Sequence, residues 1–391
     1  RGSIEAIFEA AGIETLPVDR GVQIFVDEIL CGGKRRVVAC GSLGQMDKFD
    51  SFRAPPLRLP GGVSAVLENP ERFPFIDRLL AFEEGESLTG ESTLSVSTMP
   101  FLADHSIEGT PYHPGVMALE MFAEHALLLC PDYAIAGFES VEFGLPIKLM
   151  KGEMKVRTLV SINKSEGDLI WVKALIESDL INSKGQILGN PRQHHQAVVR
   201  LIRKSEDLTG HFVNELASSP RLGVPSKGEI ILPPSFIYER YFHGPRFQSH
   251  GGVLRGVGSE QTPGCDAIAL MRHQLPSTDQ WSSESDGEAV LLECLPMLIE
   301  AGFQNAGLVA MEVDGISSLP IGIGWSSILR VPDEGEELRL RSILTGRGEG
   351  GVTIHDVTIY GSDDSPVMSL KDLHLKSMGS VPEEQKFKLN R

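Results

Sequence analysis

The stretch "PGVMALEMFAEHALLLC" (residues 114–130) decides the fold. Pro114 stands where the first turn of a helix tolerates proline, and Pro131 follows the far end, so the stretch predicts one helix. Apolar residues occupy most of its circumference, namely Val116, Leu119, Phe122, Ala126, Leu127 and Leu129. A helix that is apolar nearly all round is expected to be covered on almost every side.

Strand-like segments surround this helix in the sequence. Residues 87–98, "SLTGESTLSVST", alternate in polarity before it. Further strand candidates follow at 140–149, 153–164, 168–178 and 196–204. One buried helix served by many antiparallel strands indicates an α+β fold.

The same plan recurs later in the chain. "PMLIEAGFQNAGLVA" (296–310) is a second helix opened by proline, and "SSLPIGIGW" (317–325) echoes "FGLPIKL" (143–149). Strand candidates at 337–346 and 350–361 follow, joined by the turn "RGEGG". A recurrence at a spacing of about 180 residues suggests an internal duplication. We therefore expect a sheet wrapped around a helix, built twice.

The composition suggests where the domain boundaries lie. Residues 46–70 are rich in Pro and Gly and are typical of a linker, and the N-terminal piece is too small for a complete domain. Because the chain begins without Met, we expect a fragment of something longer. The predicted parts are an N-terminal piece (1–45), a linker (46–70), a first unit (71–204), a crossover linker (205–229), a second unit (230–378) and a polar tail (379–391).

Charge and cysteine usage exclude several classes of function. A net charge of −17 argues against binding nucleic acid or an anionic membrane surface. The five cysteines are scattered without a C-x-x-C pair, which favours reduced thiols in a cytoplasmic protein. We find neither a signal peptide nor an apolar run of the roughly 18 residues that span a bilayer.

The segment "DHSIEGTPYHPG" (104–115) is the first candidate for chemistry. A strand that stops at His105 and a helix that starts near Pro114 would place the loop beside unpaired helix amides. Gly109 lacks a Cβ, so a ligand carbonyl could approach its amide. An imidazole next to such donors suits proton removal alpha to a carbonyl. The alternative is that His105 and His113 are ordinary polar loop residues.

A second candidate is "PMLIEAGFQ" (296–304). Glu300 and Gln304 are four residues apart and share one helical face. Apolar neighbours suggest that both point into the interior, where burial would keep a carboxyl protonated near neutral pH. Glu300 is then a candidate general acid. The alternative is a surface glutamate with a neighbouring glutamine.

A third candidate is "YERYFHGPRFQSHGG" (238–252), which combines a tight turn with aromatic residues suited to lining a narrow slot. The residues singled out are Tyr241, His243, Gly244, Pro245 and Phe247. Arg240 and Arg246 flank them and could meet a phosphate or an acidic partner. The alternative is a structural turn with solvated charges.

These three segments together carry a resemblance. "HSIEGTPYHP" fits H-x-x-x-G-x-x-x-x-P, "RYFHGPRF" is similar to G-Y-x-Y-G-P-x-F, and "PMLIEAGFQ" is similar to P-x-L-L-D-x-x-x-Q. In this order they resemble the motifs of dehydratase domains from type I polyketide synthases and polyunsaturated-fatty-acid synthases. The resemblance covers residues from about 70 to 378, and residues 1–45 are similar to the trailing end of a ketoreductase domain.

The resemblance implies a double hot-dog fold with the site between its halves. It assigns the base to His105 and the acid to Glu300. Gly109 would bind the thioester carbonyl beside Pro114, while Tyr241 and Gln304 would position the acid or the leaving hydroxyl. The substrate would be a 3-hydroxyacyl chain on the phosphopantetheine of an acyl carrier protein. No cofactor or metal of its own is implied, and a homodimer is expected.

Some positions depart from the family pattern. Glu300 stands where the family usually has Asp, His243 where it has Tyr and Arg240 where it has Gly. His113 replaces an apolar residue and is expected near the mouth of the site. Other activities remain open, namely a non-catalytic scaffold, a double-bond isomerase or a cyclisation template. For the carrier protein, the candidate basic contacts are Lys148, Lys151, Lys155, Arg240 and Arg246.

Overall fold

A computed structural model describes residues 73–182, 186–204, 230–254, 266–272 and 292–387, together with Val22. The chain divides into two units, residues 1–58 and 59–391, and every element named below belongs to the second. The ketoreductase-like piece at 1–45, the linker at 46–70 and the crossover at 205–229 lie outside the described residues, except for Val22.

The first half of the fold surrounds helix α4 (Gly115–Leu129), close to the predicted span. Every residue of α4 after Gly115 is buried, as the apolar circumference indicates. Its strands are β1 (Arg78–Glu83), β2 (Ser87–Ser95), β5 (Tyr133–Phe143), β6 (Glu153–Glu166), β7 (Leu169–Ser178) and β8 (Arg192–Arg203). Buried and more exposed residues alternate along β2 and β7, so one face of each strand packs toward the helix.

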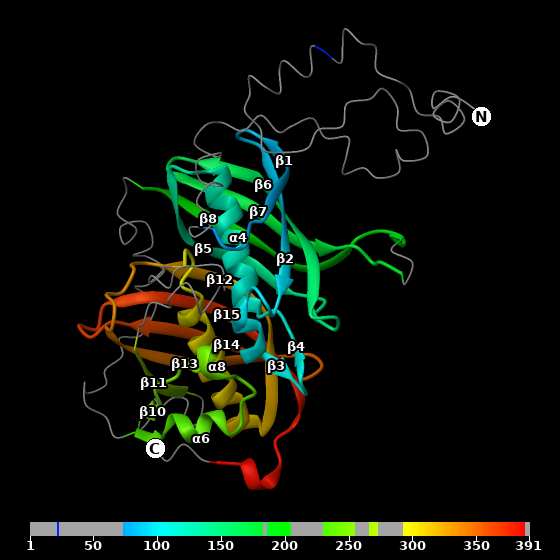
Figure 1. The fold of residues 1–391 in the computed structure, drawn as a ribbon. Helices are drawn as coiled ribbons and strands as arrows, with labels where there is room; N and C mark the ends of the chain where they lie inside the picture. Colours follow the sequence, from blue (N-terminus) through cyan, green and yellow to red (C-terminus); the bar gives the residue numbers. More distant parts are fainter. Residues whose placement is uncertain are drawn as a thin grey trace. The chain divides into compact units, whose positions relative to one another are not determined.

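The second half surrounds helix α8 (Pro296–Asp314) in the same way. Its strands are β9 (Ile230–Leu232), β10 (Val253–Leu254), β11 (Asp266–Arg272), β12 (Ile316–Ile328), β13 (Glu337–Gly348), β14 (Val352–Tyr360) and β15 (Pro366–Ser380). A short helix, α6 (Pro234–Tyr238), follows β9. Figure 1 shows α4 and α8 following one another through the middle of this unit, each lined by its own strands.

Strand order shows that the two halves share one topology. Among the described residues the sheet runs β1-β2-β6-β7-β8-β5-β12-β15-β14-β13-β11-β10-β9. In each half, the strand that follows the central helix lies at the join, and the three later strands are ordered last to first away from it. β5 and β12 pair antiparallel, with Ile323 opposite Val141. The predicted α+β duplication is therefore confirmed.

Two details of the predicted repeat differ in the structure. Leu319, Pro320 and Ile321 lie inside β12, whereas the matching residues 145–147 follow the end of β5. The echo of the letters L-P-I is thus not a structural equivalence; the equivalence is that of the two helix-to-strand units. The chain also stays in the fold beyond residue 378, because Val381 is buried and its amide donates to the Gly315 carbonyl at 2.8 Å.

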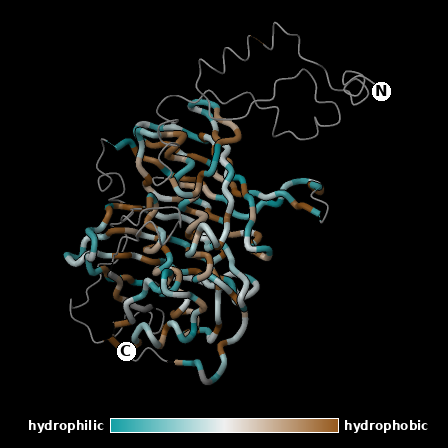
Figure 2. Tube along the Cα trace, in the orientation of Figure 1, coloured by the Kyte–Doolittle hydropathy of each residue, from teal (hydrophilic) through white to brown (hydrophobic). Residues whose placement is uncertain are grey.

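A continuous apolar core joins the halves. The main cluster includes Phe122 on α4, Ile299 on α8 and Ile323 on β12, and α4 also contacts α8. Figure 2 shows apolar and polar residues alternating along many of the strands. The core thus holds the start of α8 against the first half of the fold. The loop between β2 and α4 belongs to that half.

Candidate active site

His105 lies in the segment between β2 and α4. The sequence suggested a strand that stops at His105, but β2 stops at Ser95 and residues Pro100–Asp104 form the 3₁₀ helix η3. A small hairpin follows, made of β3 (Ser106–Ile107) and β4 (Thr110–Pro111). It brings Tyr112 back beside His105, with the Tyr112 amide donating to the His105 carbonyl at 3.0 Å.

The same hairpin fixes the imidazole of His105. Its Nδ1 lies 2.9 Å from the Tyr112 carbonyl oxygen, which can only accept a hydrogen bond, so Nδ1 carries a proton. In the neutral ring, Nε2 is then the basic nitrogen. Burial lowers the pKa of His105 to about 4. A half-buried imidazole that is neutral at pH 7, with its free lone pair on Nε2, has the properties of a general base.

Glu300 and Gln304 share the inner face of α8, as the spacing predicts. Both are buried, with 4% and 2% of their surfaces exposed. Gln304 Nε2 donates to Glu300 Oε1 at 2.8 Å and to the Phe247 carbonyl at 2.8 Å, so the amide positions the carboxylate. The catalytic role of this carboxyl stays a prediction, but its placement in the apolar interior does not depend on that role.

The charge on Glu300 differs from the expectation. Burial by itself raises the pKa of this carboxyl, but the adjacent imidazole of His243 and, to a lesser degree, His105 and the Gln304 amide hold it below its usual value. The prediction that burial keeps Glu300 protonated is therefore wrong. The apolar neighbours of Glu300 are evident in the sequence, whereas its imidazole partner comes from a distant segment.

His243 is the link between the two halves of the site. Its Nε2 lies 3.0 Å from Glu300 Oε1, and its ring centroid is 5.6 Å from that of His105. Backbone bridging pairs His105 with His243 as well. A histidine from the first half, a histidine from the loop before β10 and a glutamate from α8 thus form one buried cluster.

The turn that carries His243 docks on the His105 loop. The Gly244 amide donates to the Asp104 carbonyl at 2.7 Å, and a Cβ at Gly244 would lie only 2.6 Å from the Asp104 carboxylate. Pro245 opens the 3₁₀ helix η4 (Pro245–Phe247). Arg246 forms an ion pair with Asp104 at 2.8 Å. The close approach of Asp104 explains why residue 244 is a glycine. The ion pair between Arg246 and Asp104 was not predicted from the sequence.

Aromatic rings line this cluster, as expected. The Phe247 ring is fully buried, with its centroid 5.5 Å from that of His105. Phe242 lies edge-on to His105 at 5.0 Å and stacks on His243 at 4.3 Å. Because these rings exclude water, they strengthen the electrostatic interactions among the three polar groups.

The Tyr241 side chain supports α8 by bonding to the backbone of that helix. Its hydroxyl donates to the Gln304 carbonyl at 2.6 Å rather than to the carboxyl group. Tyr238, which sequence reasoning passed over, donates to Gln304 Oε1 at 2.8 Å and accepts the His250 amide at 2.7 Å. Tyr238 and Tyr241 are three residues apart, about one helical turn. This Y-x-x-Y spacing could have indicated that Tyr238 also belongs to the site.

Three further predicted residues have local structural explanations. Gly109 lies exposed at the tip of the β3–β4 hairpin with φ of 77°, a conformation that favours glycine. Pro114 caps α4, and its carbonyl accepts the amides of Met117 and Ala118 at 3.1 Å. Their contacts with a substrate stay predictions. His113 is not at the mouth of the site as expected, because it is buried between Phe75 and Phe101.

The basic side chains suggested for partner contact divide into two groups. Arg246 is paired with Asp104, and Arg240 stacks on Phe236 and donates to the carbonyls of Phe236 and Gln385. Both arginines therefore serve the fold. Lys148, Lys151 and Lys155 are exposed, and Lys148 lies over the ring of Tyr112, next to the His105 loop.

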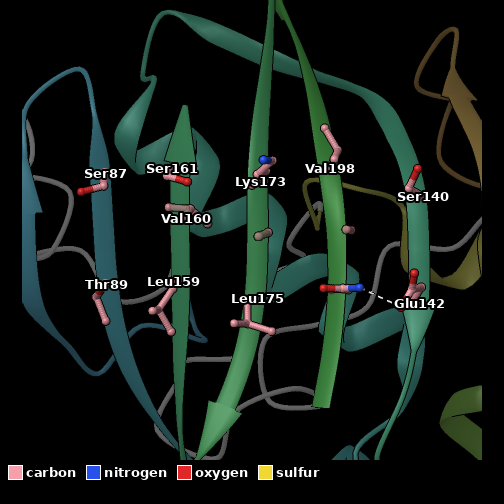
Figure 3. Close-up of a pocket in the computed structure, with 13 residues that line it drawn as sticks. Ser87, Thr89, Ser140, Glu142, Leu159, Val160, Ser161, Lys173, Leu175 and Val198 are labelled. Atoms are coloured by element: carbon pink, nitrogen blue, oxygen red, sulfur yellow. Dashed lines mark hydrogen bonds between the residues drawn. The ribbon is translucent and has the colours of Figure 1, made fainter. Parts of the chain in front are cut away.

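A hollow of about 570 Å³ lies elsewhere, on the outer face of the first half. Figure 3 shows side chains of β2, β5, β6, β7 and β8 around it, with Gln196 bonded to Glu142 at 2.7 Å. None of the predicted site residues lines this hollow. Within the described ranges, no group of His, Cys, Asp and Glu side chains is arranged to hold a metal ion, and no helix is long and apolar enough to cross a membrane.

Known proteins of similar sequence and structure indicate the class to which this fold and site belong. Residues 74–170 match the family described as "Polyketide synthase dehydratase domain". The dehydratase domain from the CurF module of curacin polyketide synthase superposes with a TM-score of 0.54 at 14% identity, covering 78% of this chain and 99% of that one. A trans-AT polyketide synthase dehydratase domain from Brevibacillus brevis superposes equally well at 16% identity, covering 78% and 98%. The chain is thus a double hot-dog protein, as predicted.

Curated relatives give sequence similarity to two groups of proteins. The chain is 29% identical over 125 residues to the 3-hydroxyacyl-[acyl-carrier-protein] dehydratase FabZ of Albidiferax ferrireducens, which covers 28% of this chain and 81% of that protein. It is 22% identical over 317 residues to polyketide synthase GfsA of Streptomyces halstedii, covering 78% of this chain but 4% of the synthase. It spans 58% of FabZ from Escherichia coli, at 37% identity over 90 residues. The chain is homologous to the dehydratase domains of polyketide synthases.

Proposed function

We propose that this chain removes water from a 3-hydroxyacyl thioester to give a 2-enoyl thioester. One observation carries the proposal: the fold brings His105 from the first half and Glu300 from the second half against the same buried imidazole, that of His243. Elimination across a C2–C3 bond requires a base and an acid close to one another. The homology to polyketide synthase dehydratase domains and to FabZ supports the same reaction.

In this proposal each half of the fold supplies one role. His105 Nε2 removes the proton from C2, since Nδ1 is committed to the Tyr112 carbonyl. The carboxyl group of Glu300, held by Gln304, delivers a proton to the departing C3 hydroxyl. The elimination as written needs no cofactor. Gly109 would meet the thioester carbonyl at the hairpin tip, as the resemblance implies.

The same proposal covers the partners. The thioester would be carried on the phosphopantetheine of an acyl carrier protein within a cytoplasmic polyketide or polyunsaturated-fatty-acid synthase, with the domain acting as a homodimer. The resemblance of the three motifs supports this assignment. Lys148, which lies next to the His105 loop, and the exposed Lys151 are where contact with an acidic carrier is expected. Arg240 and Arg246 are engaged within the fold.

The test uses the purified chain with a panel of 3-hydroxyacyl thioesters of both configurations and several lengths. Mass spectrometry follows the loss of 18 Da that accompanies loss of water. We expect turnover by the wild type, and a fall of about 10²–10⁴-fold in His105→Ala and Glu300→Ala, the typical contribution of one acid–base group. The matched control is Glu349→Ala, because Glu349 is exposed in the β13–β14 turn.

The other activities predict different products. A scaffold would leave every thioester unchanged over a long incubation. An isomerase would change the ultraviolet absorbance of an enoyl thioester without a change in mass, and a cyclisation template would form a ring. Normal turnover in either alanine variant would refute the roles assigned to His105 and Glu300.

A further inference from the structure

Glu300, the proposed acid of this site, does not itself hold the proton that the leaving hydroxyl needs. Glu300 is buried, yet the neighbouring imidazole holds its pKa below the ordinary value, so near neutral pH the carboxyl group is ionised. A carboxylate alone cannot protonate a leaving hydroxyl. If the proposed function is right, the proton must be held on a group in direct contact with Glu300.

His243 is the group in that position. Its Nε2 is 3.0 Å from Glu300 Oε1, and its side chain is 8% exposed against 6% for Glu300. We propose that His243 stores the proton that Glu300 passes to the departing hydroxyl, so that the acid of the site is an imidazolium–carboxylate pair. This inference rests on the proposed function, and it makes His243 a positioning residue that acts through Glu300.

The carboxylate and the aromatic ring that flank His243 favour its charged form, whereas the lack of a partner for Nδ1 does not. Nε2 faces an acceptor, so it carries a proton. Nδ1 is buried and, within the described residues, meets neither a donor nor an acceptor. The face of the ring stacks on Phe242 at 4.3 Å, which is a favourable surface for a cation. A lone positive charge would be costly here, but the adjacent carboxylate compensates it.

The other titratable groups around the pair are neutral or paired with an opposite charge. His105 faces His243 from the first half, and burial lowers its pKa to about 4. Tyr238 and Tyr241 face Glu300 from α6 and the turn after it, and burial raises the pKa of both hydroxyls. Arg246 and Asp104 neutralise one another as an ion pair. His243 and Glu300 are then the two groups between which a proton can be shared.

The proton balance closes without any further reactant. His105 Nε2 takes the C2 proton, the C2–H electron pair becomes the C2=C3 double bond, and the C3–O bond breaks. The proton on His243 Nε2 crosses to the carboxyl group, which gives a proton to the hydroxyl to form water. His105 is then charged and His243 neutral. Return of that proton to His243 restores the starting state, and the two rings are 5.6 Å apart between centroids.

Two substitutions separate this pair from a single buried carboxylic acid. In His243→Gln, the amide can still donate to Glu300 but stores no proton. The carboxyl group must then hold the proton itself, and carboxyls release theirs at lower pH than an imidazolium bound to a carboxylate. We expect the alkaline limb of the kcat/KM profile to move to lower pH. At pH 8 the rate should fall by roughly 10²-fold, the lower end of a general-acid contribution.

A role for His243 in structure alone would lower the rate at every pH without moving that limb, and this result would overturn the inference. The matched control is His355→Gln. His355 is another buried histidine, bonded to Thr353 on β14, and it interacts with Asp314 at the C-terminal end of α8 rather than with the cluster near its start. We expect its substitution to leave the alkaline limb where it is in the wild type.

A spectroscopic measurement does not depend on turnover. In protein labelled with ¹⁵N-histidine, we expect an imidazolium signal at pH 8 that disappears in His243→Gln and becomes that of a neutral ring in Glu300→Gln. A neutral His243 in the wild type would overturn the inference even if the enzyme dehydrates its substrate. Conversely, an imidazolium in a chain that dehydrates no thioester would refute the proposed function and leave the charge pair standing.

Discussion

Two buried glutamates, one on each central helix, differ in what they do. Glu120 lies on α4 and Glu300 on α8, with 1% and 4% of their surfaces exposed. Glu120 accepts the amides of Glu293 and Cys294 at 2.6 and 2.9 Å, just before α8 begins. Glu300 instead meets the His243 imidazole and the Gln304 amide. One carboxyl group anchors the backbone, and the other faces an ionisable ring.

Their pKa values move in opposite directions. Burial raises the pKa of Glu120 to about 7, because two amide hydrogen bonds offset only part of the cost of burying the charge. Burial acts on Glu300 in the same direction, but its imidazole partner outweighs it, and the pKa falls. Depth in the core is nearly the same for both, so the chemistry of the partner decides the charge state.

Glu120 has a structural role, whereas Glu300 belongs to the candidate active site. Glu120 ties the first half to the segment that enters α8, and so positions the start of the helix that carries Glu300. Leu295 precedes α8 with φ of 54°, a conformation unusual for leucine. The two amides held by Glu120 belong to the residues directly before it. A helix of the first half thus fixes the place at which a helix of the second half begins.

The largest expected effect follows from removing this anchor. Glu120→Ala leaves one buried and one part-buried amide without an acceptor, at about 1–3 kcal/mol for each group. We expect the free energy of unfolding to fall by about 2–6 kcal/mol, measured by denaturant titration. The matched control is the exposed Glu349→Ala, for which we expect little change. A loss below about 0.5 kcal/mol would show that the anchor contributes nothing beyond an ordinary surface residue.

Much of the architecture could be predicted from the sequence, because periodicity reports burial directly. The apolar circumference of 114–130 and the proline-led second helix predicted two covered helices, and strand order confirms the duplication. The polar residues on the same helices were harder to interpret. Glu120, Glu124 and His125 are all buried, although nothing in their spacing indicates partners that come from distant segments.

The candidate site shows the same division. His105, Glu300 and Gln304 could be selected from motif order, and the structure brings them together. The charge on Glu300 could not be predicted, because His243 lies 57 residues earlier and reaches the carboxyl only through the docking of one loop on another. Pairings such as Arg246 with Asp104 depend on that docking too. Local patterns therefore identified the residues, whereas tertiary contacts decide their protonation.

The next expected effect concerns pH. Histidines whose pKa values are lowered by burial, among them His105, His125 and His250, take up protons on unfolding between about pH 6.5 and 4, so stability falls as the pH falls. Glu120, with its pKa raised to about 7, holds a proton longer in the folded state and opposes this trend between about pH 4.5 and 7.

Glu120→Gln removes that opposing contribution. Between pH 7 and 5, we expect its free energy of unfolding to fall more steeply than that of the wild type, by up to about 1.4 kcal/mol per pH unit. Denaturant midpoints measured at several pH values give the two slopes. Equal slopes would show that Glu120 ionises in the folded protein as it does in water, and the contrast between the two carboxyl groups would disappear.

The smallest effect tests how Glu300 is held. The Tyr241 hydroxyl donates to the Gln304 carbonyl, not to the carboxylate. We expect Tyr241→Phe to lower the free energy of unfolding by about 1 kcal/mol, the net value of one hydrogen bond, while the dehydration rate changes only a few-fold. Tyr238→Phe is the matched variant, because the Tyr238 hydroxyl bonds the Gln304 side chain that positions Glu300. Loss of this hydroxyl should affect the dehydration rate more strongly than the free energy of unfolding. A loss of rate in Tyr241→Phe as large as in Glu300→Ala would mean that this hydroxyl meets the substrate, as the family resemblance implies, and that the partners of Glu300 extend beyond one imidazole and one amide.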